Sequence, residues 1–259
     1  MRLTKREITG FQKMIFSWWK THKRDLPWRR THDPYKILVS EVMLQQTQVS
    51  RVLPKYTEFL QRFPTAHALA KAPTSEVLRA WKGMGYNRRA LYLKKATHAG
   101  KFSNSEKELA KLPGVGTYTA RALLVFAYGK NIALVDTNIR RIITHFFFAD
   151  KPQKEPVIQH VADELLPQGK SWEWHQALMD YGALEMSSKG RSASGRKKIK
   201  PKVPFKNSNR YYRGRIVDLL RERPMKERTI LKDVSASVID SLLKDGLIER
   251  KNGILSLPT

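Results

Sequence analysis

Short helical patterns separated by prolines fill most of this chain. Between residues 1 and 186, apolar residues recur three and four positions apart, the spacing that places them on one face of a helix, in residues 8–20, 35–48, 51–63 and 155–166. Prolines, which cannot continue a helix, stand at the breaks: Pro27, Pro34, Pro64, Pro73 and Pro113. The alternation of apolar and polar residues that marks strands is nearly absent. We therefore expect an all-α fold for residues 1–186.

The net charge indicates the class of partner. The 259 residues carry a formal net charge of +26 at pH 7, which predicts a polyanion, most commonly a nucleic acid. An anionic membrane is the alternative, but no apolar run approaches the roughly 20 residues that span a bilayer. Lys5, Arg6 and Glu7 also interrupt any signal-peptide core. We expect a nucleic acid as the partner, no membrane, and a location in the cytoplasm or another compartment that contains nucleic acid.

Metal and cofactor chemistry is not favoured by the composition. The chain contains no cysteine, which excludes disulfides, thiolate metal sites and cysteine-ligated iron–sulfur clusters. None of its seven histidines forms a pair at the i, i+4 spacing of a helical metal site. No phosphate-binding loop or dinucleotide-binding glycine motif is present. We expect no metal and no cofactor.

The composition changes after residue 186. Residues 187–215 contain eleven lysines or arginines and no acidic residue. We interpret residues 1–186 as one domain and 187–208 as a basic linker. This linker either makes no specific contact or lies along DNA phosphates, where it adds affinity without sequence information.

Residues 209–259 have the pattern of a small winged-helix-like domain. Helices are expected over 210–222 and 226–232, and a third from a Ser235 cap to Gly246. Residues 247–250 and 254–257 flank a Lys-Asn-Gly turn, which predicts a β-hairpin. The third helix carries one basic residue, so it is a poor candidate for reading a DNA groove. A protein contact and a loose DNA contact both stay open.

The segment Leu112-Pro113-Gly114-Val115-Gly116 joins two helical patterns. Its glycines permit a tight backbone that a Cβ would obstruct. The N–H groups at the start of the following helix can bind a phosphate. The segment therefore predicts sequence-independent binding of the DNA backbone by Gly114, Val115 and Gly116, although an ordinary helix–helix turn is also compatible with it.

This hairpin resembles that of the endonuclease III and adenine glycosylase superfamily. Four other strings occur in the family's order and at about its spacing: Leu26-Pro27-Trp28-Arg29, the SEVMLQQTQV of residues 40–49, Gly83-Met84-Gly85-Tyr86 and Val135-Asp136-Thr137-Asn138. The string at 40–49 is specific to the adenine glycosylase branch. The resemblance covers about residues 8–186. It implies a two-lobed, monomeric helix-hairpin-helix DNA glycosylase of base excision repair. The expected partner is then double-stranded DNA with a mismatched or damaged base, and the expected location is cytoplasmic and nucleoid-associated.

Two carboxylates carry the expected chemistry. Glu41 lies among apolar residues, and a carboxyl in apolar surroundings keeps its proton to higher pH, which suits a general acid. From the residues alone, the solvated face of an amphipathic helix is the alternative. Asp136 can cap the helix that opens near Asn138. The resemblance implies that Glu41 protonates the departing base and that Asp136 stabilises the cationic sugar, with Asn138 among the catalytic residues.

Tyr118 predicts the type of glycosylase. At the equivalent position, endonuclease III relatives carry a lysine whose amine attacks the sugar and permits strand cleavage. A phenol cannot form a Schiff base, so we expect a monofunctional glycosylase with little or no lyase activity.

Further positions receive DNA-binding roles by resemblance. Gln46, grouped with Gln45, is expected to fill the stack as a wedge, and Met84 and Tyr86 to contact the opposite base and the pocket. Positions near the extruded base are Arg24, Trp28, Arg29 and Gln176. Structural alternatives exist for two of them, because Trp28 could belong to the core and Arg24 could pair with Asp25 or Asp33.

The chain departs from the family in two places. Most adenine glycosylases hold an iron–sulfur cluster after a G-A-x-x-C string, but here Met186 stands where the first cysteine would fall. About 50 residues also replace the larger C-terminal domain that recognises oxidised guanine.

Three functions therefore remain open. The first is excision of adenine opposite guanine or 8-oxoguanine. The second is excision of thymine or uracil opposite guanine, as in relatives that share the P-W-R-x-T-x-D-P-Y pattern of residues 27–35. The third is non-enzymatic DNA binding.

Overall fold

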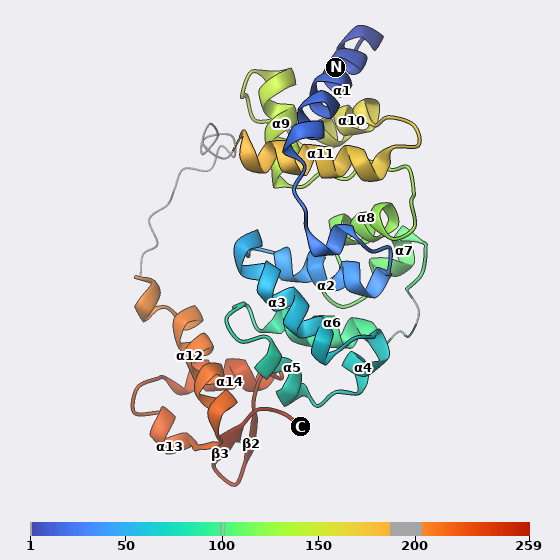
Figure 1. Cartoon of the computed structure of the whole chain (residues 1–259). Coiled ribbons are helices and arrows are strands. Elements are labelled where there is room, and N and C mark those ends of the chain that lie inside the picture. Colours follow the sequence, from blue (N-terminus) through green and yellow to red (C-terminus); the bar gives the residue numbers. More distant parts are fainter. Residues whose placement is uncertain (1, 99, 101, 187–203) are drawn as a thin grey trace. The chain divides into compact units, whose positions relative to one another are not determined.

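The computed structural model describes residues 2–98, 100, 102–186 and 204–259 (Figure 1). Helices dominate, which confirms the expected all-α class, and a small sheet lies near the C-terminus. The chain forms two compact units. The first takes its described residues from Met1–Ile37, Ser103–Lys111 and Val115–Ile199, and the second from Leu38–Phe102, Leu112–Gly114 and Lys200–Thr259. Each unit is thus assembled from segments far apart in the sequence.

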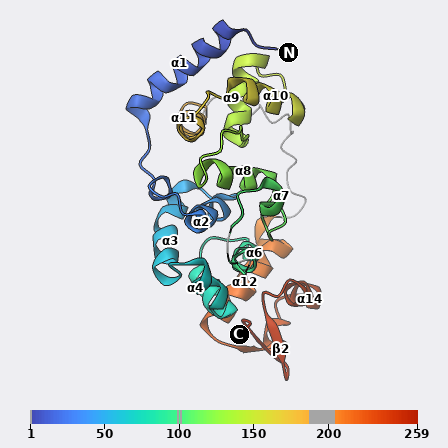
Figure 2. The ribbon, with the colours of Figure 1, turned by 90° about the vertical axis from the view of Figure 1, so that its right-hand side faces the viewer.

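The first unit is helical throughout its described residues. Its elements are α1 (Lys5–His22), the 3-10 turn η1 (Pro27–Arg29), α7 (Glu106–Leu109), α8 (Thr117–Phe126), α9 (Thr137–Phe148), α10 (Glu155–Leu165) and α11 (Ser171–Leu184). α11 lies between α1 and α9 (Figure 2). α1 and α10 confirm the helices expected over residues 8–20 and 155–166.

The apolar face of α1 shows why this unit folds. Phe11, Ile15 and Trp19 are spaced four residues apart, so they lie on one side of the helix, and all three are buried. The ring of Phe11 meets that of Trp174 on α11 edge-on, with centroids 5.9 Å apart. The core of the first unit is therefore built where α1 and α11 meet.

Helix α2 (Pro34–Leu44) begins in the first unit and ends in the second. Leu38, Val39 and Met43 are fully buried, as expected for a helix that is apolar on all sides. The sequence pattern predicted a helix to residue 48, which is wrong. The helix stops because Gln46 takes a left-handed conformation with φ of 56°, which an α-helix does not contain.

The second unit combines a helical part with the C-terminal segment, which is the part of the chain from residue 204 onward. Its helices are α3 (Val49–Arg62), α4 (Ala66–Lys71), α5 (Thr74–Ala80), α6 (Arg88–Thr97), the 3-10 turn η2 (Phe205–Asn207), α12 (Asn209–Glu222), α13 (Glu227–Ile230) and α14 (Ala236–Lys244). α3 confirms the helix expected over residues 51–63.

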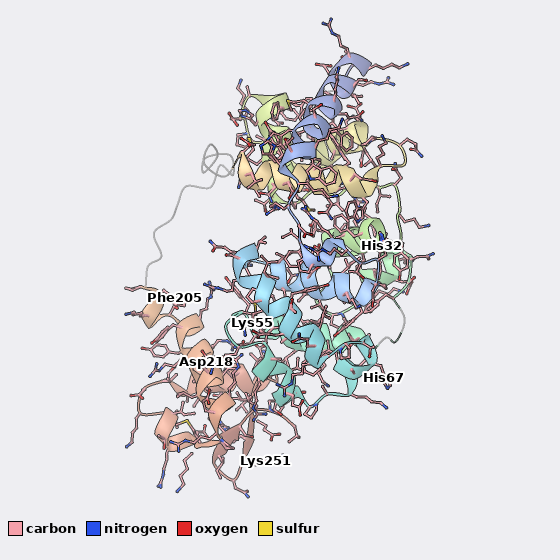
Figure 3. All side chains as sticks on the ribbon, in the orientation of Figure 1. His32, Lys55, His67, Phe205, Asp218 and Lys251 are labelled. Carbon is pink, nitrogen blue, oxygen red and sulfur yellow. The ribbon has the colours of Figure 1, made fainter. Side chains whose placement is uncertain are left out.

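The C-terminal segment is winged-helix-like, as predicted. Strands β2 (Glu249–Lys251) and β3 (Ile254–Ser256) form the expected hairpin, which carries Lys251 (Figure 3). Asn252 and Gly253 both have positive φ, as a tight two-residue hairpin turn requires. The prediction missed β1 (Met225–Lys226), which pairs with β3 to complete an antiparallel sheet of order β1-β3-β2.

Two local expectations need correction. In place of the helix expected over 226–232, Lys226 belongs to β1 and only the short helix α13 follows it. Ser235 stands at the N-cap position of α14, but its side chain does not cap the helix and instead meets the Ser237 hydroxyl at 3.0 Å.

The C-terminal segment packs on α5 within the second unit. The buried Arg221 of α12 donates from Nε to the Leu78 carbonyl and from Nη2 to Asn87 Oδ1, both at 2.9 Å. Arg79 donates back to the Arg221 carbonyl at 3.2 Å, and an ion pair of 2.8 Å joins Lys82 to Glu222. These contacts fix α12 against the glycine-containing turn at residues 83–86.

The linker predicted at 187–208 lies mostly outside the described residues, and the domain boundaries at 186 and 209 stay predictions. Among the helices of the described ranges, none is both long and apolar enough to cross a membrane.

Candidate active site and its supporting residues

Glu41 lies on α2 and is only 9% exposed. Its neighbours in the helix are buried apolar side chains, including Leu38 and Val42. The alternative of a solvated helix face is therefore wrong. The general-acid role expected of Glu41 stays a prediction.

Directly after α2, the backbone turns sharply through Gln45 and Gln46. Gln46 is exposed and has a φ of 56°, so its side chain projects from a left-handed backbone position. A second loop has the same character, because Tyr86 has a φ of 45° and follows two glycines with positive φ. We call these two segments, Gln45–Thr47 and Gly83–Tyr86, the paired loops.

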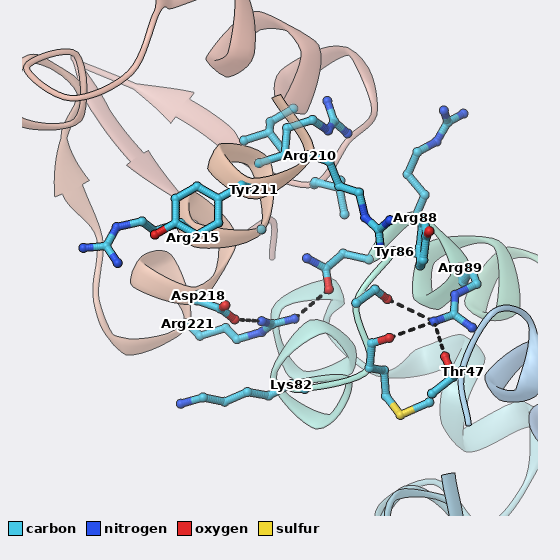
Figure 4. Close-up of a pocket in the computed structure, with 18 of the residues that line it drawn as sticks. Thr47, Lys82, Tyr86, Arg88, Arg89, Arg210, Tyr211, Arg215, Asp218 and Arg221 are labelled. Atoms are coloured by element: carbon cyan, nitrogen blue, oxygen red, sulfur yellow. Dashed lines mark hydrogen bonds and ion pairs between the residues drawn. The ribbon is translucent and has the colours of Figure 1, made fainter. Parts of the chain in front are cut away.

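Arg89 holds the paired loops together. Its Nη1 donates to the carbonyls of Val42, Met43 and Gln45, and its Nη2 donates to Thr47 Oγ1 and to the Met84 and Gly85 carbonyls, at 2.5 to 3.2 Å (Figure 4). The Val42 and Met43 carbonyls belong to the last turn of α2. The Arg89 guanidinium therefore also lies at the negative end of the dipole of the helix that carries Glu41.

The guanidinium of Arg89 has no carboxylate partner among the described residues. Burial lowers the pKa of Arg89 to about 10, partly offset by Tyr86. The Arg89 Nε is buried without a hydrogen-bond partner. Burying the Arg89 guanidinium without a counter-charge costs free energy, and the hydrogen bonds that offset this cost fix the shape of the paired loops.

The paired loops line a groove of about 1070 Å³ within the second unit. Gln45, Gln46, Met84 and Tyr86, all expected to bind DNA, contribute to its wall. Met84 is buried, whereas Tyr86 is 37% exposed. The structure therefore brings together these four predicted residues, and their contact with DNA stays a prediction.

The helix-hairpin-helix forms where the sequence placed it, between α7 and α8. Gly114 has a φ of +77°, and a Cβ there would lie 2.8 Å from Tyr92 Cβ, so this position needs glycine. Gly116 has ordinary φ and open space around it, so the backbone does not require glycine there. Val115 is buried, and Arg121 joins α8 to α7 through a 3.0 Å ion pair with Glu106.

Tyr118 lies in the first turn of α8 and is half-buried. Tyr118 occupies the position where endonuclease III relatives carry the reactive lysine. The nearby Lys111 is exposed and pairs with Glu108 at 2.7 Å. The expectation about strand cleavage is therefore unchanged by the structure.

Asp136 caps α9, as the sequence suggested. Its Oδ1 accepts from the Ile139 N–H at 2.7 Å, and its Oδ2 accepts from Asn138 Nδ2 at 3.1 Å. Burial raises the pKa of Asp136, and the hydrogen bonds from Ile139 and Asn138 oppose that shift. The hydrogen bonds at the helix N-terminus favour the charged form of Asp136, but burial has the larger effect on its pKa. The electrostatic role expected of Asp136 stays a prediction.

Asn138 is itself fixed by close packing. A Cβ added at Gly182 on α11 would lie 2.5 Å from Asn138 Cβ, so the two helices approach closely there. His175 on α11 holds the irregular segment before Asp136, since its Nε2 accepts from the Leu134 N–H at 3.1 Å and its Nδ1 meets the Ser171 carbonyl at 2.6 Å. Burial lowers the pKa of His175 to about 4 and keeps the ring neutral.

Arg24 and Arg29 share one buried carboxylate. Arg29 donates to both Asp180 oxygens at 2.7 and 2.8 Å, and Arg24 Nε meets Asp180 Oδ1 at 2.5 Å. Trp19 Nε1 adds a third donor at 2.8 Å. The alternative that Arg24 pairs with Asp25 or Asp33 is wrong, because Arg24 pairs with Asp180 and Asp25 pairs with Arg30.

The Arg29 side chain is only 5% exposed and its donors are directed to Asp180, which argues against direct contact with DNA. Trp28 and Gln176 are buried as well. Roles near the extruded base stay predictions for Arg24, Trp28, Arg29 and Gln176.

The residues at the family's cluster position do not fit an iron–sulfur cluster. Met186 is 3% exposed and packs in the interior, and this chain has no cysteine to supply a thiolate. Within the described ranges, no group of three or more potential metal ligands is present either.

Sequence reasoning missed Arg89, Asp180 and His175. Arg89 follows another arginine in an Asn-Arg-Arg-Ala string, and only the fold shows that Arg88 is exposed while Arg89 is buried. An acidic residue in the apolar run of α11 was the available signal for Asp180.

Comparisons with known proteins agree with this geometry. The profile of the HhH-GPD superfamily of base excision DNA repair proteins matches residues 39–168. The chain is 36% identical over 268 residues to the adenine DNA glycosylase of Mycolicibacterium smegmatis, with 91% of this chain and 92% of the relative covered. It is 33% identical to a thymine/uracil-DNA glycosylase of Methanothermobacter thermautotrophicus, with 70% of this chain and 86% of the relative covered.

A solved thermostable thymine-DNA glycosylase shares the fold, with a TM-score of 0.66 and 31% identity over 71% of this chain and 89% of the other. Profile, relatives and fold point to the same family as the hairpin, the paired loops and the capped aspartate. The chain belongs to the helix-hairpin-helix superfamily of base excision DNA repair proteins, in its adenine DNA glycosylase branch.

Proposed function

We propose that this protein is a monofunctional DNA glycosylase that hydrolyses the N-glycosidic bond of adenine paired with guanine or 8-oxoguanine. The observation that carries the choice of adenine is the extent of the similarity. The match to the adenine glycosylase covers 91% of the chain. Residues 1–186 are a smaller share of the chain than this, so the match extends into the C-terminal segment. The match to the thymine/uracil enzyme covers 70%.

In the proposed reaction, the target nucleotide is extruded from the duplex. Glu41 donates its proton to the departing adenine as the bond between C1′ and the base nitrogen breaks. The carboxylate of Asp136 stabilises the cationic sugar that results. Water attacks C1′, either directly or by displacing Asp136 from a transient covalent bond, and becomes the hydroxyl there, while the other proton of that water returns to Glu41.

Two features of the structure support these roles. Glu41 is a buried carboxyl on an apolar helix whose end is fixed by Arg89. Asp136 is held at the N-terminus of α9 by Ile139 and Asn138. Tyr118 supports the monofunctional part of the proposal, because its phenol cannot form the Schiff base that strand cleavage requires.

Excision of thymine or uracil opposite guanine is the second candidate. The solved thymine-DNA glycosylase, at 31% identity, favours it. Both candidates use the same carboxylates and differ in the base that is bound.

Single-turnover base release from two labelled duplexes tests the proposal. One duplex holds adenine opposite 8-oxoguanine and the other holds thymine opposite guanine, and alkali reveals the abasic sites. We expect release of adenine. Release of thymine alone would move the protein to the second candidate, and duplex binding without release from either would leave a DNA-binding protein. A covalent adduct trapped by borohydride would contradict the monofunctional part.

Two variants test the assigned roles. Glu41→Gln removes the proton donor, and release should slow at least about 100-fold. Asp136→Asn keeps a side chain that caps helices as well as aspartate does, so a similar loss would report the chemistry and not the fold. Near-normal release by Asp136→Asn would contradict the role given to Asp136.

The proposed substrate places the protein in the compartment that contains the chromosome, acting as a monomer on double-stranded DNA.

A further inference from the structure

The groove between α12 and the paired loops, which we call the α12 groove, is strongly cationic. Eight arginines and lysines line it against two carboxylates, Asp218 and Glu222. Tyr86, Tyr92, Phe205 and Tyr211 add aromatic surface. Cations interleaved with aromatic rings are what a groove for nucleic acid offers, because the cations meet phosphates and the rings meet bases.

Both walls of the α12 groove are fixed in place. Arg89 holds the paired loops through six acceptors. On the other wall, the buried Arg221 joins α12 to Leu78 and Asn87. The groove is therefore formed before any ligand enters, which lowers the entropic cost of binding.

Within the described ranges, four arginines of the groove have no carboxylate within ion-pair distance. Arg89 is one of them and binds the paired loops, and the other three are Arg51, Arg210 and Arg215. Arg210 is distinctive because its guanidinium lies 4.0 Å from the centroid of the Tyr86 ring and 5.7 Å from that of Phe205. Figure 4 shows Arg210 and Tyr86 together at one end of the groove and Arg215 with Tyr211 at the other.

The position of Arg210 does not serve the stability of α12. It is the second residue of that helix, where the helix dipole disfavours a cation. It is also exposed. A guanidinium held over an aromatic ring is positioned without using its N–H donors, so the donors of Arg210 remain available to a ligand.

The chemistry of the proposed reaction requires such a donor. The excised adenine is an ordinary base, so adenine alone cannot mark the error, and the enzyme has to read the base opposite it. Extrusion leaves that base unpaired. Guanine offers two acceptors, O6 and N7, to which arginine donates in a bidentate pair. In 8-oxoguanine N7 carries a hydrogen and no longer accepts, so arginine can donate there to O6 or to the added O8. Cytosine offers an amino donor on its exposed groove edge, which arginine cannot bind.

We propose that the α12 groove receives the strand opposite the excised base and that Arg210, stacked on Tyr86, reads guanine or oxidised guanine there. The C-terminal segment is then part of the specificity site. The identity of the opposite base rests on the proposed function, whereas the ability of the groove to distinguish guanine does not.

The test measures binding without catalysis. Duplexes carry an uncleavable abasic-site analogue opposite guanine, 8-oxoguanine or cytosine, and dissociation constants come from fluorescence anisotropy at fixed salt. The wild type should bind one or both purine duplexes more tightly than the cytosine duplex, and the two purines show which one Arg210 prefers. Arg210→Ala should reduce that discrimination about tenfold.

Three further variants keep the result specific. Arg210→Lys retains the charge without the fork, so discrimination should fall while the salt dependence of binding persists. Arg215→Ala removes the same charge from the far end of the groove and should weaken all three duplexes alike. Arg228→Ala, at the second residue of α13 and outside the groove, should change neither quantity.

Equal weakening of all three duplexes by Arg210→Ala, or no change, would overturn the inference, as would a wild type that does not distinguish guanine from cytosine. Base release from the adenine duplex is measured separately. If the wild type releases no adenine but Arg210→Ala still abolishes discrimination, the proposed function fails and the reading of guanine stands.

Discussion

Asp180 in the first unit is a carboxylate enclosed by two guanidinium groups, whereas Arg89 in the second is a guanidinium enclosed by neutral oxygens. Asp180 is completely buried, and burial raises its pKa, but Arg29, Arg24 and Trp19 outweigh this effect and hold the pKa below the ordinary value. Arg89 has no counter-charge among the described residues, so burial lowers its pKa to about 10.

The difference shows two ways of fixing backbone with a buried charge. The Asp180 cluster joins side chains and depends on the exact balance of charge. The Arg89 cluster joins carbonyls of two loops and depends on the number and geometry of its donors. Removing one member should therefore have different consequences in the two units.

The largest effect is expected for Asp180→Ala. It leaves the buried Arg29 guanidinium without a carboxylate partner, with the Arg24 carbonyl as its remaining acceptor, so the free energy of unfolding should fall by about 3–5 kcal/mol, measured by urea denaturation. Asp25→Ala is the matched control, because Asp25 pairs with Arg30 on the surface, and it should cause little change. If Asp180→Ala and Asp25→Ala were equally stable, the Asp180 cluster would not depend on its balance of charge.

His175, on the same helix as Asp180, sharpens the comparison through pH. Its pKa is about 4 in the folded protein and about 6.5 when unfolded, so the unfolded state takes up the proton first. Stability should be unaffected above about pH 7, fall as the pH drops through 6.5, and lose on the order of 3 kcal/mol by about pH 4.

The control for this acid loss is His175→Gln, whose amide can accept from Leu134 but does not titrate. Urea denaturation from pH 7.5 to 4 should show a shallower decline for this variant than for the wild type. Identical declines would mean that His175 is not held neutral by burial.

A smaller effect is expected for Arg89→Lys. Lysine keeps the charge but offers three donors to six acceptors, so the free energy of unfolding should fall by about 2 kcal/mol. The single-turnover rate of base release at saturating enzyme should also fall at temperatures where both proteins are folded, because the paired loops and the end of α2 lose their fixed shape. Arg88→Lys is the matched neighbour, and a rate for Arg89→Lys equal to that of Arg88→Lys would contradict the positioning role.

Features that depend on neighbouring residues could be predicted from the sequence. Helix α1, the cap by Asp136 and the hairpin around Gly114 each follow from spacing or turn chemistry within a few residues. The Asn252-Gly253 turn belongs to the same group.

Contacts between distant residues could not be predicted. Asp180 meets Arg29 across 151 positions, and nothing in either local pattern names the other. Arg89 binds carbonyls, which every residue possesses, so its partners leave no trace in the side-chain pattern. The short strand β1 depends on pairing with β3, not on any alternation within its two residues.

The docking of α12 on α5 has a consequence for synthesis on the ribosome. Leu78 and Arg221 are separated by 143 positions, and Lys82 and Glu222 by 140. At translation rates of about 5–20 residues per second, α5 emerges on the order of ten seconds before α12 can reach it. The second unit therefore stays incomplete while the first is being made, and the face of α5 that α12 covers stays uncovered until the last part of the chain is synthesised.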